Sequence, residues 1–230
     1  MMDRPVSQQS AARLLNQGLL LAVCAVAVMA FAGPANAHTG TMTSGGFTDG
    51  FLHPLLGWDH IIAMVAVGLW GAILGAPALW LLPVVFPLVM VVGGALGVAG
   101  VPIPEVETGI ALSGVVLGGM VAGAVRPPLW LAALIVGAFG IFHGHAHGTE
   151  LIEFTFRYTQ LAPGPAVCST EPPAADPVAF SMGFVVATGL LHLGGVAFGL
   201  LAHWPAGVVA VRVVGAGIAL GGLGFLGGFW

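Results

Sequence analysis

Residues 128–150, PLWLAALIVGAFGIFHGHAHGTE, combine a long apolar run with three histidines and a glutamate at its end. No charged residue precedes His143 in this stretch, and the run to His147 has the roughly 20 residues that a transmembrane helix needs. In a bilayer every backbone polar group must be satisfied within the protein, which leaves only helices and closed barrels. Unbroken apolar runs of this length do not fit the alternating pattern of a barrel. The stretch therefore predicts an all-α integral membrane protein.

The composition of the whole chain supports this fold class. Of its 230 residues, 58% are hydrophobic and 6% are charged, and the mean hydropathy is +1.03. Only five residues are basic, so no basic patch for nucleic acid is expected. The 37 glycines suit helices that approach one another closely in lipid. Close packing is expected at the pairs Gly93/Gly97, Gly114/Gly118 and Gly119/Gly123.

The N-terminal end has the features of a cleavable signal peptide. Two arginines precede an apolar stretch at 18–32, and a small-x-small pattern ends at Ala37. We therefore predict a signal peptide at 1–37 and a mature membrane domain at 38–230, with its N-terminus in the periplasm. An uncleaved signal anchor is the alternative.

The remaining hydrophobic runs predict a bundle of six transmembrane helices, at 54–75, 78–100, 107–124, 128–147, 177–201 and 206–229. The proline-rich segment 151–176 is expected to be an external loop between the fourth and fifth helices. With the mature N-terminus outside, Trp80, Trp130 and Trp204 would lie near the cytoplasmic surface of the membrane.

Ionisable residues gather at the outer ends of these predicted helices. They are His53, Asp59, His60, Glu105, Glu107, His143, His147 and Glu150. A random scatter of polar residues would not collect on one side of the membrane, and ionisable groups in spans usually mark a functional path. Imidazole and carboxylate are ligands for divalent transition metals. Glu105 is expected only to complement the dipole of the helix that follows it. The other residues predict a metal site or path at the outer side.

The spacing of the histidines in FHGHAHGTE indicates which of them share a site. On a helix of 3.6 residues per turn, His143, His147 and Glu150 lie on one face, whereas His145 points to the opposite side. We expect the first three, and not His145, to face the metal. The alternative is that these histidines form satisfied hydrogen bonds between helices, or that the last turn is frayed.

The stretch HPLLGWDH, residues 53–60, opens the first predicted helix. Pro54 suits the first helical position, which would place His60 two turns deeper than His53, roughly 10 Å along the axis. Bonds from imidazole to a metal are about 2.0–2.1 Å, so one ion could not touch both rings without a helix break. The spacing predicts that His53 and His60 bind an ion one after the other along a path, with Asp59 beside His60.

Three further residues are candidate metal ligands. Glu107 either complements the dipole of the helix it opens or reaches other helices as a ligand. His192 is expected to line the path rather than to pack as a core residue, because its flanking glycines allow either the close approach of another helix or a local break that lines a cavity. Those glycines are Gly189, Gly194 and Gly195. His38 would become the N-terminal residue after cleavage, and its α-amine and ring could chelate an ion together; alternatively, it only follows the cleavage site.

Four motifs resemble the HupE/UreJ family of nickel (and cobalt) permeases. They are H-x5-D-H at 53–60, VETGIALSG at 106–114, FHGHAHGTE at 142–150 and ATGLLHLGG at 187–195. The resemblance covers essentially the whole mature chain. It implies uptake of Ni²⁺ or Co²⁺ for hydrogenase or urease maturation across a bacterial inner membrane. It also implies that the protein is not an enzyme, has no permanently bound cofactor, and has the transported ion and the bilayer as its partners.

An intramembrane metal-dependent hydrolase is the alternative function. His143 and His147 have the spacing of paired zinc ligands, and a nearby glutamate could act as a base. Two observations oppose this function: the H-E-x-x-H motif is absent, and no serine or other nucleophile is expected beside the cluster.

Overall fold

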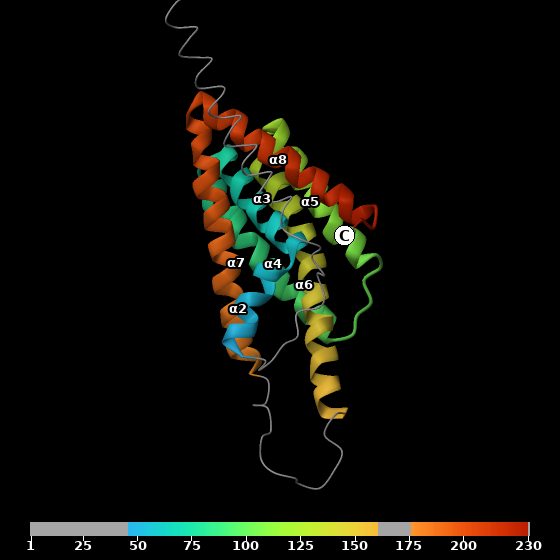
Figure 1. Cartoon of the computed structure of the whole chain (residues 1–230). Helices are drawn as coiled ribbons and strands as arrows, with labels where there is room; N and C mark the ends of the chain where they lie inside the picture. The colour runs from blue at the N-terminus through green and yellow to red at the C-terminus, as the bar shows by residue number, and fades with distance from the viewer. Residues whose placement is uncertain (1–45, 161–175, 230) are drawn as a thin grey trace, which may run out of the picture.

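The computed structural model describes residues 46–160 and 176–229, and within them the chain is entirely helical (Figure 1). The elements are α2 Phe47–Leu56, α3 Trp58–Leu74, α4 Ala78–Val98, α5 Val106–Gly123, α6 Leu129–Gln160, α7 Pro177–Gly199, the 3₁₀ helix η1 Leu200–His203, and α8 Pro205–Leu226. The predicted signal peptide at 1–37 and the candidate ligand His38 lie outside the described residues. The all-α prediction is confirmed.

Five of the described helices are long and apolar enough to cross a membrane, namely α4, α5, α6, α7 and α8. A sixth span is present only if α2 and α3 are counted together, because these two helices meet at an angle of 82°. The prediction of one continuous helix at 54–75 is therefore wrong, because the chain breaks at Gly57. Four other predicted helices begin and end within a few residues of α4, α5, α7 and α8.

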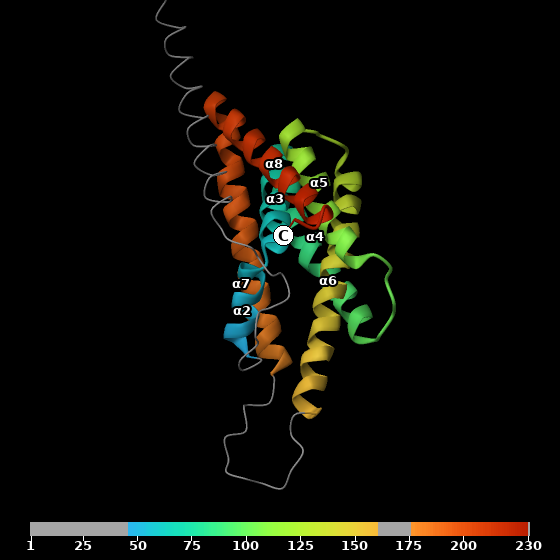
Figure 2. The ribbon, with the colours of Figure 1, turned by 45° about the vertical axis from the view of Figure 1, so that its right-hand side comes forward.

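The helix α6 is much longer than the predicted span at 128–147. It runs without a break to Gln160, so its C-terminal part extends beyond the neighbouring helices in Figures 1 and 2. The prediction that the external loop begins at residue 151 is wrong, because residues 151–160 contain neither proline nor glycine to end the helix. Apolarity predicts where a helix crosses a bilayer, whereas helix-breaking residues decide where it stops.

Two helix pairs pack backbone against backbone at glycines. A side chain on Gly93 or Gly97 of α4 would strike the main chain of α6, which confirms that predicted pair. The pair Gly114/Gly118 of α5 is also confirmed, since a Cβ on Gly118 would strike the main chain of α8 and one on Gly114 would lie 3.2 Å from the Gly222 main chain of α8 and 3.0 Å from the Ile62 side chain. The pair Gly119/Gly123 is not confirmed. A Cβ on Gly119 would have no atom of the described residues within 4 Å, and one on Gly123 would meet only the Val125 side chain, just beyond the same helix.

The helix α3 lies at the centre of the bundle and contacts α4, α5, α7 and α8. Its side chains are buried on almost every side, including Met64 and Trp70. The Trp70 indole N–H donates to the Val125 carbonyl at 2.9 Å, and Arg212 Nε donates to the Ala122 carbonyl at 2.7 Å. These donors satisfy carbonyls at and just beyond the C-terminal end of α5, where a helix leaves its last carbonyls unpaired. Both bonds lie at the end of the bundle where α3 and α5 finish.

Replacing Gly144 of α6 with alanine is expected to destabilise the bundle. Its Cβ would collide with the Met90 main chain of α4, and a backbone neighbour cannot move aside as a flexible side chain can. We expect a loss of roughly 1–3 kcal/mol, as for other overpacked interiors. Thermal unfolding in detergent should show this as a lower midpoint. Gly189→Ala is the matched control, because a Cβ there has no described atom within 4 Å; equal midpoints for the two variants would contradict the prediction.

Candidate metal site

A break between α2 and α3 shapes the end of the bundle at which α3 begins. Gly57 is extended, with φ −88° and ψ 111°, and it ends one helix and begins the next. A Cβ at this position would lie 2.9 Å from Asp59 Oδ1 and 2.9 Å from His60 Nδ1. Only glycine therefore leaves room for these two side chains to fold back over the break.

The break corrects the predicted separation of His53 and His60. Pro54 lies inside α2 rather than at a first helical position, and the 82° turn after it brings the two rings together. Their ring centroids are 6.2 Å apart, whereas a continuous helix would separate the residues by roughly 10 Å along its axis. The prediction that His53 and His60 bind the ion at positions two turns apart is therefore wrong, because both rings belong to one compact group of histidines.

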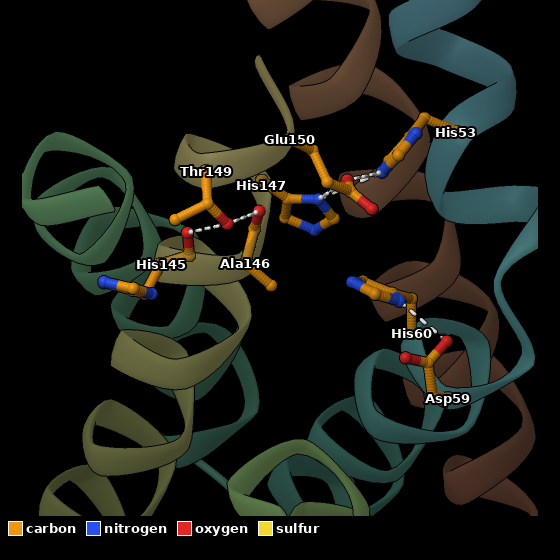
Figure 3. A network of polar contacts seen from close by, with 8 residues as sticks. All are labelled: His53, Asp59, His60, His145, Ala146, His147, Thr149 and Glu150. Atoms are coloured by element: carbon orange, nitrogen blue, oxygen red, sulfur yellow. Dashed lines mark hydrogen bonds and ion pairs between the residues drawn. The ribbon is translucent and has the colours of Figure 1, made fainter. Parts of the chain in front are cut away.

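His53, His147 and Glu150 form the outer triad, a set of three ligand atoms that converge from α2 and α6 (Figure 3). His53 Nε2 lies 3.0 Å from His147 Nδ1 and 3.1 Å from Glu150 Oε2, and the last two atoms are 3.5 Å apart. A circle through the three atoms has a radius of about 1.9 Å, so an ion about 2.1 Å from each fits just off their plane. The triad can therefore hold a divalent transition metal without large movements of its side chains.

The outer triad is partly open to its surroundings. The side chains of His53 and His147 are 13% and 12% exposed, and that of Glu150 is 22% exposed. A bound ion could thus keep water on its outer side, while His147 Nε2 is buried and has no hydrogen-bond partner among the described residues. The ring of His147 accordingly has one nitrogen in the triad and one directed away from it.

Behind the outer triad lies a second pair, Asp59 and His60. His60 Nδ1 is 2.8 Å from Asp59 Oδ1, and both side chains are buried. Because a carboxylate only accepts, the ring donates from Nδ1, and Nε2 carries its lone pair. The ring centroid of His60 lies 4.5 Å from that of His147 and 5.0 Å from that of His143. This geometry suits Asp59 to orienting His60, the arrangement that commonly fixes a metal-binding histidine.

His143 lies deeper and has a partner that the sequence did not reveal. Its Nε2 is 2.9 Å from Ser113 Oγ of α5, and both side chains are fully buried. The expectation that no serine accompanies the cluster is therefore wrong. Ser113 is 30 residues away in the chain, and only the packing of α5 against α6 brings it to the histidine. Its hydroxyl also lies 2.6 Å from the Ile110 carbonyl.

Phe86 separates His143 from the deepest histidine, His192. The Phe86 ring centroid is 5.4 Å from that of His143 and 5.7 Å from that of His192, and all three side chains are buried. Neither ring nitrogen of His192 has a hydrogen-bond partner of standard geometry among the described residues. Nothing in the sequence distinguishes Phe86 from the other aromatic residues of the apolar spans.

The glycines around His192 act only in part as expected. A side chain on Gly195 would strike the α3 main chain, so this glycine does permit the close approach of α3 and α7. Gly189 and Gly194 have no described atom within 4 Å of a Cβ position, so their expected role in helix approach is wrong.

His145 points away from the outer triad, as its helical position predicts (Figure 3). Its Nε2 lies 2.8 Å from the Val101 carbonyl and so links α6 to the segment between α4 and α5. Glu105 accepts a hydrogen bond from Thr108 Oγ1 at 2.9 Å and remains exposed. Glu107 is exposed in the first turn of α5, and the structure does not bring it into the outer triad.

A crevice of about 340 Å³ opens beside His147, between α4, α6 and α7. Apart from His147 and Ser181, its lining is apolar or glycine, and it includes Val91 and Val185 on the exposed surface. Such a surface fits a lipid chain better than a hydrated cation. The crevice is therefore not a candidate ion site, although it borders His147.

A family model described as HupE / UreJ protein matches residues 26–163 and 158–225. The chain belongs to the HupE/UreJ family. It is 39% identical to Protein HupE of Rhizobium leguminosarum bv. viciae over 201 residues, which cover 87% of this chain and 94% of the relative. No solved structure is significantly similar to it. HupE/UreJ proteins are transporters linked to nickel and cobalt, so this HupE/UreJ protein is a multi-pass membrane transporter and the hydrolase alternative is not favoured.

Proposed function

We propose that this HupE/UreJ protein takes up Ni²⁺, with Co²⁺ as a second substrate, across the inner membrane of a bacterium for hydrogenase or urease maturation. The observation that carries the proposal is the outer triad, in which His53, His147 and Glu150 place three ligand atoms around one ion-sized position. Two imidazoles and a carboxylate bind Ni²⁺ well and bind it less tightly than thiolates would. Moderate affinity suits transport, because an ion must both enter and leave its site.

The arrangement of the histidines supports a route inward from the outer triad. His147 has its second ring nitrogen on the buried side, and its ring lies beside that of His60. An ion released by the triad would next meet His60 and then His143, whose rings are 5.0 Å apart. His192 would follow beyond the Phe86 ring. Copper and zinc compete for such ligands, so selectivity must come from geometry and metal availability.

The orientation we propose places the outer triad on the periplasmic side. The helices α4, α6 and α8 all begin at the opposite end of the bundle, and a tryptophan lies at or beside the start of each. These residues, Trp80, Trp130 and Trp204, are all strongly exposed. Tryptophans concentrate at both membrane–water interfaces, so these side chains suit a membrane surface at this end of the bundle. Arg126, between α5 and α6, and Arg212, bonded to the Ala122 carbonyl, also lie near this end, and an excess of arginine and lysine favours the cytoplasmic side.

Purified protein in lipid vesicles tests the transport proposal. We expect radioactive nickel to accumulate inside the vesicles above the level of protein-free vesicles, and cobalt to compete more effectively than magnesium, which prefers oxygen ligands. Glu150→Gln should lower this uptake, because it removes the charge of the outer triad while keeping the size of the side chain. Vesicles that take up no more nickel than empty ones would contradict the proposal.

A further inference from the structure

The contact between Ser113 and His143 determines which ring nitrogen of the histidine can bind a metal. Ser113 Oγ lies 2.6 Å from the Ile110 carbonyl and 2.9 Å from His143 Nε2. Both side chains have an exposed fraction of 0%, so neither bond exchanges with bulk water. The two distances together fix the direction of both hydrogen bonds.

A serine hydroxyl has one proton to donate, whereas a carbonyl can only accept. Two oxygens 2.6 Å apart repel unless a proton lies between them, so Ser113 donates to Ile110. Its oxygen must then accept from His143, which places a proton on Nε2 of the ring. In the neutral ring the other nitrogen, Nδ1, therefore carries the lone pair.

The surroundings of His143 Nδ1 match those of a metal ligand. This atom is buried and has no hydrogen-bond partner among the described residues. The ring lies between that of His60, at 5.0 Å, and that of Phe86, at 5.4 Å. A histidine that binds a metal through one nitrogen usually donates the other N–H to a fixed acceptor. Ser113 is such an acceptor.

We infer that Ser113 is a positioning residue, which holds His143 in the tautomer that offers Nδ1 to a divalent cation between the outer triad and His192. The inference rests on the proposed function, because the cation is the transported ion. Asp59 and Ser113 then have the same role at two different histidines. Asp59 fixes a proton on Nδ1 of His60, and Ser113 fixes one on Nε2 of His143. Successive histidines thus present opposite ring nitrogens.

The tautomer can be measured in metal-free protein, independently of transport. Nitrogen NMR of the full chain, labelled at histidine, should show His143 protonated at Nε2, with the resonance identified by its loss in His143→Gln. In Ser113→Ala the acceptor is gone, and we expect the Nδ1-protonated form to appear. A wild-type ring protonated at Nδ1, or a spectrum unchanged by Ser113→Ala, would overturn the inference.

Uptake measurements test whether this tautomer matters for the ion. Ser113→Ala should lower nickel uptake by about tenfold or more, as loss of a hydrogen bond behind a metal ligand commonly does. Thr149→Val is the matched control, because within the part of the chain that the structure describes the Thr149 hydroxyl donates only to the His145 and Ala146 carbonyls of its own helix; its uptake should stay near that of the wild type.

The double variant Ser113→Ala/His143→Ala separates positioning from a general structural role. If Ser113 acts only through His143, the double variant should transport as slowly as His143→Ala alone. A further loss in the double variant would overturn the inference. If the wild-type protein takes up no nickel, the proposed function fails, whereas the NMR spectrum still decides whether Ser113 sets the tautomer.

Discussion

Nickel uptake into vesicles should fall to the level of protein-free vesicles when His147 is replaced with alanine. This residue supplies a ligand atom to the outer triad, 3.0 Å from His53 Nε2, and its ring also adjoins that of His60. Its loss removes one of three ligands from the first site and interrupts the route to the second. His60→Ala should have a similar effect, because that ring lies between those of His147 and His143.

The matched control for this prediction is His145→Ala, on the same helix two residues away. The His145 ring bonds to the Val101 carbonyl and faces away from the outer triad, so its loss should leave uptake nearly intact (Figure 3). Each variant should also be assayed for thermal stability in detergent, because His145→Ala removes a link between α6 and the α4–α5 segment. Equal loss of uptake for His145→Ala and His147→Ala would contradict the assignment of the site.

A single methyl group at Gly57 is expected to lower nickel uptake by about ten- to a hundredfold, the range found when groups that orient metal ligands are displaced. The Cβ of Gly57→Ala would lie 2.9 Å from both Asp59 Oδ1 and His60 Nδ1, so the hydrogen-bonded pair must move. Alanine also favours helix over the extended backbone that this position needs. A straighter junction would carry His53 away from His147.

The effect of Gly57→Ala should appear in transport more than in stability, because the atoms in its way belong to side chains and not to the main chain. Vesicle uptake and thermal unfolding, measured on the same preparation, distinguish the two. Gly119→Ala provides the control, since a Cβ there meets no described atom within 4 Å. Wild-type uptake by Gly57→Ala would show that the break does not position the metal ligands.

Much of the candidate site followed from helical periodicity alone. His143, His147 and Glu150 recur at the spacing of one helix face, and the structure directs all three away from the side that His145 occupies. This prediction succeeded because α6 is regular and continuous through the motif. The corresponding prediction for His53 and His60 failed because it assumed the same regularity across Gly57, where the helix breaks.

The sequence by itself determined that the chain is an all-helical membrane protein and which face of α6 carries the candidate metal ligands. Both conclusions depend on properties of a single helix, namely its apolarity and its period of 3.6 residues. Only the tertiary structure decided that His53 contacts His147, that Ser113 is hydrogen-bonded to His143, and that the Phe86 ring packs against that of His192. Each of these contacts joins different helices. Their geometry depends on the break at Gly57 and on glycine-mediated packing, which the spacing of residues along one helix does not encode.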